Sequence, residues 1–197
     1  MNYMRLTTTA GFVLALLTLP AAAGDFEEGQ KFFASKDYSR AVESLTKAAE
    51  QGNAKAQLQL GIRYFIGLAI TQDYQQAVYW YLKAAEQGSA SAQLQLGGMY
   101  DDGIGVTQDY QQALIWYLKA AEQGNAMGQI KLGNMYTHGK GVMQDYIEAH
   151  KWFSIANANG HEGGRKNRGL VEKHMTPSQI AEAKQRVSEW TAEHKLP

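Results

Sequence analysis

The sequence of 197 residues contains no cysteine and 3 prolines, and its 19 Lys and Arg residues are balanced by 19 Asp and Glu residues. Without cysteine there can be no disulfide framework, thiolate metal site, iron–sulfur cluster or cysteine nucleophile. A formal net charge of zero argues against a polybasic surface for nucleic acids or anionic membranes. We therefore expect no nucleic-acid partner, and recognition that depends on local side chains.

Long apolar segments are also scarce. The apolar run over residues 10–19 follows Arg5 and precedes Pro20 and three alanines, 21–23. This order is typical of a signal peptide with an A-x-A-type cleavage site. The run is shorter than the roughly 20 residues that span a bilayer, and Pro20 disfavours the other alternative, a buried N-terminal helix. We expect cleavage after Ala23, a periplasmic or secreted chain, and no stable membrane insertion after cleavage.

Glycine, in contrast, is abundant: the chain has 20, although each costs about 1 kcal/mol in a helix interior. Gly61, Gly97 and Gly133 recur with a step of 36 residues. The same step relates Tyr64, Tyr100 and Tyr136, Asp73, Asp109 and Asp145, and Trp80, Trp116 and Trp152. A fixed period of this length indicates stacked helical repeats that bury a continuous core.

Each unit is predicted to contain two helices. The first covers residues 54–65, with Gly61 placed where a neighbouring backbone must come close. Asp73 is expected to cap the second helix, and Gln76 stands at the spacing of a capping box. Glycine at position 88 then ends that helix. Along the second helix an apolar stripe is formed by Tyr74, Ala77, Tyr81 and Ala84, with Trp80 beside it.

The motif A-x-A-Q-L-Q-L-G-x-M-Y…G-x-G-V-x-Q-D-Y-x-x-A-x-x-W-Y-x-K-A-A-E-Q-G closely resembles the Sel-one-like repeat family, longer-looped relatives of the tetratricopeptide repeat. Residues 90–124 match almost throughout, residues 54–88 have Ala69 for the second loop glycine, and residues 126–160 diverge late. The resemblance implies an all-α, right-handed α/α superhelical solenoid of antiparallel helix pairs with a C-terminal capping helix. It also implies a protein or peptide partner, a scaffold or adaptor role, and no enzymatic activity.

The repeats suggest a division of the whole chain. A signal peptide (1–23) is followed by a tetratricopeptide-like repeat (24–52), three Sel-one-like repeats (53–88, 89–124 and 125–160) and a C-terminal capping segment (161–197). The first repeat has an inter-helix loop four residues shorter, because Gly29 and Tyr38 are nine residues apart, whereas Gly61 and Tyr74 are thirteen apart.

The C-terminal segment departs from the repeat. Residues 160–168 are polar and glycine-rich, so no full fifth copy is expected. Thr176, Pro177 and Gln179 then provide the N-cap, first-turn proline and capping box of a last helix. Its apolar stripe is Ile180, Ala183, Val187 and Trp190.

One pattern suggests catalysis. Ser44 and Lys47 form an S-x-x-K sequence, the nucleophile motif of penicillin-recognising enzymes, and some cysteine-rich relatives in the family have been labelled β-lactamases. Lys47 is nevertheless the repeat lysine, equivalent to Lys83, and the sequence has no S-D-N or K-T-G element. A cell-envelope enzyme or a muropeptide- or β-lactam-binding protein therefore remains the alternative function.

Other chemical sites have weaker support. Gly139, Lys140 and Gly141 occupy a repeat turn and lack the spacing of a phosphate loop. The five histidines form no metal motif, and His138 and His150 are expected at the surface or an interface. We expect no catalytic residue, cofactor or metal, and a monomeric protein.

Function in a solenoid is expected at positions that vary while the frame repeats. In the tetratricopeptide register these positions lie on the first helix of each pair and face a concave groove. The candidates are Phe33, Lys55, Ile62, Phe65, Asp101, Asp102, Asn134 and Thr137. They are apolar near the N-terminus and polar or acidic further on, a pattern that suits an extended peptide or a protein loop. The alternative is that the variation is drift around a plain core.

Overall fold

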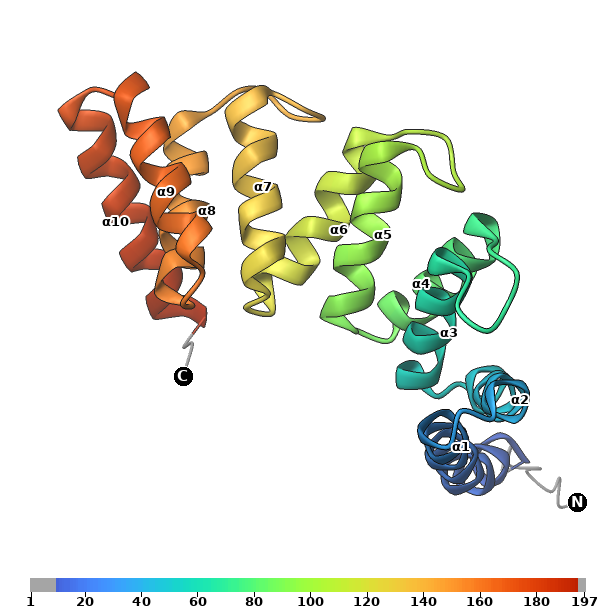
Figure 1. The fold of residues 1–197 in the computed structure, drawn as a ribbon. Coiled ribbons are helices and arrows are strands. Elements are labelled where there is room, and N and C mark those ends of the chain that lie inside the picture. The colour runs from blue at the N-terminus through green and yellow to red at the C-terminus, as the bar shows by residue number, and fades with distance from the viewer. Residues whose placement is uncertain (1–9, 195–197) are drawn as a thin grey trace, which may run out of the picture. The chain divides into compact units, whose positions relative to one another are not determined.

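The computed structural model describes residues 10–194, and all regular secondary structure in this range is helical (Figure 1). The helices are α1 (Ala10–Ala34), α2 (Tyr38–Glu50), α3 (Ala54–Ile66), α4 (Tyr74–Glu86), α5 (Ala90–Asp102), α6 (Tyr110–Glu122), α7 (Ala126–His138), α8 (Tyr146–Ala158), α9 (Glu162–Val171), the 3₁₀ turn η1 (Glu172–His174) and α10 (Pro177–His194). The all-α prediction is confirmed. The chain forms two compact units, one up to Ala84 and one from Ala85.

The helix ends follow the predicted caps. The Asp109 carboxylate accepts hydrogen bonds from the N–H groups of Gln111 and Gln112 at 2.9 and 3.0 Å. The reciprocal half of the predicted capping box is absent, because the Asp109 N–H donates to the carbonyl of Tyr100 instead. Asp73 and Asp145 repeat both features. The aspartate carboxylate therefore caps the second helix, and the aspartate N–H bonds the last turn of the first helix.

A glycine–ring contact joins the two helices in the pairs α3–α4, α5–α6 and α7–α8. A Cβ atom at Gly61 would lie 2.6 Å from Cδ1 of Tyr81, so the α4 ring fills the space left by the missing side chain. Gly97 with Tyr117 and Gly133 with Phe153 repeat this contact. The prediction that a backbone approaches Gly61 was wrong in this respect, since an aromatic ring does so. Because α4 starts at the end of α3 and returns past Gly61, the helices of the pair run antiparallel.

A buried glutamine joins successive pairs. The side-chain amide of Gln129 donates to the carbonyl of Ala121 at 3.0 Å, from α7 to the end of α6. Gln57 and Gln93 make the same bond to Ala49 and Ala85, at 2.9 and 3.1 Å. A buried amide without a partner would be costly, so these bonds explain why the repeat keeps a polar residue inside the core.

In the first unit, the loop between α1 and α2 covers residues 35–37, whereas that between α3 and α4 covers residues 67–73. The predicted four-residue difference is confirmed. Helix α1 runs through Pro20 and the alanines after it, although the sequence disfavoured such a helix. Ala22 is buried, and its carbonyl accepts a hydrogen bond from the Asn53 side chain at 3.3 Å. The predicted cleavage site thus lies inside α1 of the unprocessed chain, and residues 1–9 of the expected signal peptide lie outside the described residues.

The second unit ends in two further helices (Figure 1). The glycine-rich segment after residue 160 forms α9, where Gly164 packs so closely on α8 that a Cβ atom would lie 2.5 Å from the Phe153 carbonyl oxygen. The sequence did not predict this helix. The predicted capping helix, α10, is confirmed: Trp190 packs edge-on against Trp152, with ring centroids 5.7 Å apart. Thr176 and Gln179 form the full capping box at its start. Between residues 10 and 194, no helix is long and apolar enough to cross a membrane.

Candidate partner-binding sites

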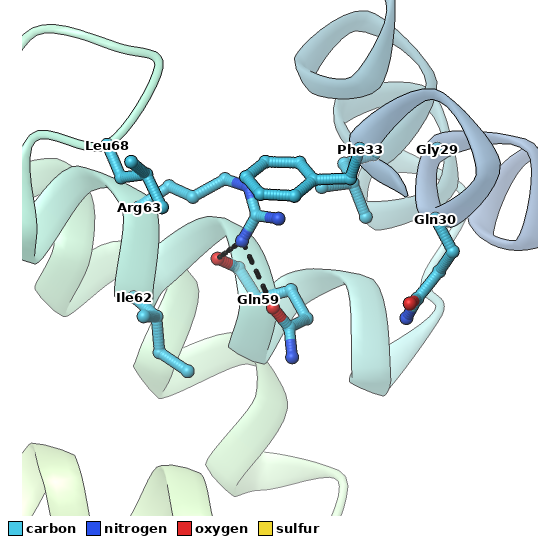
Figure 2. A pocket seen from close by; sticks show the side chains of 8 residues that line it. Gly29, Gln30, Phe33, Gln59, Ile62, Arg63 and Leu68 are labelled. Carbon is cyan, nitrogen blue, oxygen red and sulfur yellow. Dashed lines mark hydrogen bonds between the residues drawn. The ribbon is translucent and has the colours of Figure 1, made fainter. Parts of the chain in front are cut away.

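A pocket of about 350 Å³ lies between α1, α2 and α3 in the first unit (Figure 2). Two of the predicted groove residues, Phe33 and Ile62, line it from α1 and α3. The remaining lining residues are Gly29, Gln30, Leu45, Gln59, Arg63 and Leu68. The walls are therefore mainly apolar, with two amides and one guanidinium as the polar groups.

Arg63 dominates the chemistry of this pocket although it is 7% exposed. Its guanidinium stacks on the Phe33 ring at 4.0 Å from the centroid (Figure 2). Nη1 donates to the side-chain and main-chain oxygens of Gln59, at 3.0 and 3.4 Å. Nε is buried and has no hydrogen-bond partner within the described chain. Burial lowers the pKa of Arg63, but an arginine remains protonated in proteins, so the pocket carries a positive charge.

The repeat register gives Arg63 its significance. Met99 and Met135 stand 36 and 72 residues later, and both are buried. A charged residue therefore occupies a position that the two later repeats give to an apolar core residue. Sequence reasoning missed Arg63 because it examined the positions expected to face the groove. The useful signal was a charge at a core position of the repeat.

In the second unit, the predicted residues Asp101, Asp102 and Asn134 line one pocket of about 370 Å³. This pocket also contains Lys131 and Lys140, so its charge is mixed rather than acidic. The Asp101 carboxylate pairs with the Lys140 ammonium at 3.5 Å and accepts a 3.5 Å hydrogen bond from the hydroxyl of Tyr117. Asp101 is consequently held by its own chain in this structure.

Asn134 also lines a neighbouring pocket of about 310 Å³, together with Thr137. Its other walls come from α7, α8 and α9 and the turn after α9, and include Phe153, Leu170 and His174. The Thr137 hydroxyl donates to the Gly133 carbonyl of its own helix at 2.8 Å. Because part of this pocket is supplied by α9, the glycine-rich segment contributes a wall that the sequence did not predict.

Two predicted groove residues lie outside these pockets. Lys55 is exposed near the start of α3. Phe65 packs against Tyr74 across the loop between α3 and α4, with ring centroids 5.5 Å apart. Tyr74 itself, expected in the apolar stripe, is 40% exposed. The structure therefore gathers Phe33 and Ile62 in one unit, and Asp101, Asp102, Asn134 and Thr137 in the other, while Lys55 and Phe65 stand apart.

Ser44 and Lys47 line a pocket of about 320 Å³ with Glu43 and Arg40. The Lys47 ammonium donates to the Glu43 carboxylate at 2.8 Å. This bond raises the pKa of Lys47, whereas a lysine that removes a proton from serine needs a lowered pKa. Ser44 occupies the repeat tryptophan position and is itself buried. The geometry thus does not favour an activated serine.

His150 was expected at a surface or interface, and it is 1% exposed inside the second unit. Its Nε2 bonds the Glu172 carboxylate at 2.9 Å, and its Nδ1 bonds the Ser154 hydroxyl at 3.3 Å. The neutral imidazole suits both bonds if Nε2 carries the proton. Burial lowers the pKa of His150, although Glu172 acts in the opposite direction. His138, in contrast, is exposed. No cluster of three or more His, Asp or Glu residues suited to a metal occurs between residues 10 and 194.

The chain is similar to solved structures of helical repeat proteins. The first is c5321, described as a protective antigen of uropathogenic Escherichia coli strains with an SLR fold: it is 35% identical, with a TM-score of 0.79 over 88% of this chain and 38% of that one. A Sel1 repeat protein from Oxalobacter formigenes is 36% identical, with a TM-score of 0.69 over 74% of this chain and 60% of its own. This chain therefore spans about two fifths and three fifths of these proteins.

A third similar structure is cysteine rich protein B from Helicobacter pylori, 28% identical with a TM-score of 0.53 over 66% of this chain and 94% of that one. Among proteins of curated function, none matches the chain. The Sel1 repeat family model matches residues 23–53, 54–89, 90–125 and 126–161. Sel1 repeat proteins commonly mediate protein–protein interactions. With four matched repeats covering most of its length, the chain belongs to the Sel1 repeat family.

Proposed function

We propose that this chain is an exported, monomeric, non-enzymatic scaffold that binds a peptide or protein partner through the pockets on the first helices of its repeats. The supporting observation is that the residues that build the frame are the same in successive repeats, whereas the residues that line the pockets differ. Gly97, Gln93 and Asp109 are used for ring packing, pair-to-pair bonding and capping, and their counterparts are the same in the next repeat. The pocket positions change instead: Ile62 and Arg63 in α3 correspond to Asn134 and Met135 in α7.

The binding role can be tested by crosslinking capture from an envelope extract, followed by mass spectrometry. The test variant is Ile62→Asp, which places a charge in the wall of the first pocket. The matched control is Ile115→Asp, because Ile115 is 44% exposed on α6 and belongs to none of the pockets described above. A partner captured by the wild type and the control, but lost with Ile62→Asp, supports the proposal. Capture unchanged by pocket substitutions in both units, Ile62→Asp and Asn134→Arg, would contradict it.

Export is part of the proposal and rests on Arg5, the apolar run and the alanines at 21–23. Expression of the full chain in a bacterium, followed by N-terminal sequencing of the envelope fraction, should give Gly24 as the first residue. Ala23→Leu should block processing, since the site requires a small side chain. A cytoplasmic chain that still begins at Met1 would exclude export.

The non-enzymatic part of the proposal is checked with a chromogenic β-lactam. The protonated, Glu43-paired Lys47 makes turnover unexpected. Hydrolysis that is present in the purified wild type and lost in Ser44→Ala would overturn the scaffold proposal. The corresponding control is Ser154→Ala, which removes another serine hydroxyl in the second unit.

A further inference from the structure

The Arg63 guanidinium is a buried cation without a carboxylate of its own. It is 7% exposed, and the ion pairs within the described chain do not include it. Removing an ion from water without a counter-charge is among the most costly events in folding. The two later repeats avoid this cost with buried methionines, Met99 and Met135. An arginine at this position therefore needs a reason beyond packing.

The neighbours of Arg63 satisfy part of its hydrogen-bonding capacity. One terminal nitrogen bonds Gln59 twice, and the Phe33 ring face covers the guanidinium at 4.0 Å. The attraction of a cation to a ring face is weaker than the cost of removing the charge from water. The buried Nε–H remains without an acceptor in the described part of the chain. Nη1 bonds Gln59, and Nη2 bonds no group of the described chain, so Nη2 is the donor that the guanidinium offers to the pocket.

We propose that the Arg63 pocket binds the carboxylate of a glutamate or aspartate side chain, carried by an extended and otherwise apolar segment of a partner protein. This proposal rests on the proposed binding function and specifies its chemistry. A carboxylate is planar and accepts two parallel N–H bonds from a guanidinium, which makes the pair short and directional. The pocket volume of about 350 Å³ accommodates one such side chain and part of a neighbouring apolar one.

The other walls fit a main chain that passes across the pocket. Gln30 on α1 and Gln59 on α3 carry amides that both donate and accept, as the N–H and C=O groups of an extended peptide require (Figure 2). Ile62 and Leu68 offer apolar surface to the residues that flank the acidic one. When the acidic residue is internal, its side chain bonds the guanidinium and the main chain on both sides of it bonds the amides. A chain-terminal carboxylate would be followed by no further main chain for the amides to bond.

The experiment uses three N-acetylated peptides and the full chain. The first is acetyl-Gly-Leu-Glu-Leu-Gly-amide, the second has Gln in place of Glu, and the third is acetyl-Gly-Leu-Gln-Leu with a free C-terminal carboxylate. Binding is followed by NMR at the Nε–H resonance of Arg63 and the methyl groups of Ile62. We expect the Glu peptide to bind at least tenfold more tightly than the other two. It should also be the one peptide of the three that shifts the Arg63 resonance.

Two variants separate local recognition from general charge. Arg63→Met introduces the residue that the two later repeats have at this position, so it should fold, raise the melting temperature and abolish the tenfold preference for Glu over Gln. Arg165→Met removes the same charge from an exposed site on α9 and should keep the preference. A preference that survives Arg63→Met would contradict the proposal, whether or not that variant is more stable.

The remaining outcomes are also decisive. Equal binding of the Glu and Gln peptides would overturn the carboxylate assignment, while leaving a peptide-binding function in place. Preference for the free C-terminus would assign the pocket to a chain end and overturn the internal-residue proposal. No response of Arg63 and Ile62 to any peptide at 10 mM would overturn the pocket proposal altogether. The envelope capture with Ile62→Asp then decides independently whether the proposed function also fails.

Discussion

A Cβ atom at Gly97 would lie 2.6 Å from Cδ1 of Tyr117, so a ring of α6 occupies the space that a side chain on α5 would need. Tyr117 is fully buried, and burial together with the nearby Asp101 raises the pKa of its hydroxyl. The Tyr117 side chain has no solvent-exposed surface, and its hydroxyl donates to the Asp101 carboxylate. The repeated step of 36 residues between Gly97 and its counterparts therefore reflects a steric requirement between two helices.

Gly97→Ala should destabilise the protein even though alanine is the better helix former. The added methyl group would overlap the Tyr117 ring, and overpacking of this kind costs about 1–3 kcal/mol. The measurement is the urea midpoint of the helical circular-dichroism signal. Gly98→Ala is the matched control, since its nearest atom outside the helix is the Tyr117 hydroxyl oxygen at 3.7 Å. It should stabilise by about 0.5–1 kcal/mol through helix propensity; equal effects of both substitutions would refute the steric explanation.

Ala69→Gly should stabilise the first unit. Ala69 has φ +65°, a left-handed conformation that its counterparts Gly105 and Gly141 adopt at +71° and +67°. Alanine in this region is strained by about 1–2 kcal/mol, which the substitution relieves. The greater conformational freedom of glycine in the unfolded chain offsets part of this gain in stability. A net gain of about 1 kcal/mol in unfolding free energy is expected from urea denaturation.

The reverse substitution, Gly105→Ala, provides the control for the loop. It introduces the same side chain at the equivalent position of the next repeat and should lower the stability by about 1 kcal/mol. If Ala69→Gly leaves the urea midpoint unchanged while Gly105→Ala lowers it, the strain at Ala69 is relieved in solution and the prediction is wrong.

The stability of the second unit should decrease as the pH falls below about 6.5, the ordinary pKa of histidine. The pKa of His150 is lowered in the folded chain by burial, so the unfolded chain binds the proton more readily. The stability is fully present above the unfolded pKa and is lost as the pH falls to the folded pKa. Glu172 and Ser154 contact the imidazole, and Arg168 and Lys184 contribute positive charge that opposes protonation.

Thermal unfolding between pH 8 and pH 5 measures this effect. His150→Gln should remove the part of the pH dependence centred just below 6.5, because the amide does not titrate there. His138→Gln replaces an exposed histidine in the same unit and should retain it. An identical pH profile for the wild type and His150→Gln would show that His150 does not couple protonation to folding.

Trp190→Ala should open the C-terminal end of the second unit. Trp190 is 8% exposed and covers Trp152, Ile155 and Leu132, so its removal leaves a large cavity. Truncation of a buried tryptophan costs about 3–5 kcal/mol. Limited proteolysis should cleave α10 earlier, and the urea midpoint should fall. Thr191→Ala changes the adjacent exposed residue and should stay within about 0.5 kcal/mol of the wild type; a loss as large as that of Trp190→Ala would argue against the capping role.

The sequence predicted the helices well because their signals are local. Asp109 and Thr176 cap helices through bonds to main-chain groups two or three residues away, and such bonds need nothing from the rest of the fold. The glycine at position 88 adopts the expected positive φ of +87° for the same reason. The helix α9 was missed because its glycines weaken the local signal, and Gly164 is required by contact with α8 instead.

The candidate site was predicted in part. Phe33 and Ile62 do meet in one pocket, since the repeat register places them on facing parts of α1 and α3. Phe65 turned out to pack on Tyr74 within its own pair, and the predicted acidic end holds Lys131 and Lys140 as well as Asp101. The register gives the direction of a side chain from its own helix, and the neighbour it meets depends on how the next helix packs.

The amino-acid sequence by itself determined the 36-residue frame, its capped helices and the absence of cysteine chemistry, because a repeated pattern and short-range hydrogen bonds are properties of the chain alone. The tertiary structure decided that the partner of Gly97 is an aromatic ring and that Arg63 lies buried on Phe33. These contacts join residues from different helices, and they exist only once the helices have packed. Abundant glycine marks the repeat in the sequence, whereas Arg63, which pairs with no carboxylate between residues 10 and 194, marks the proposed binding pocket.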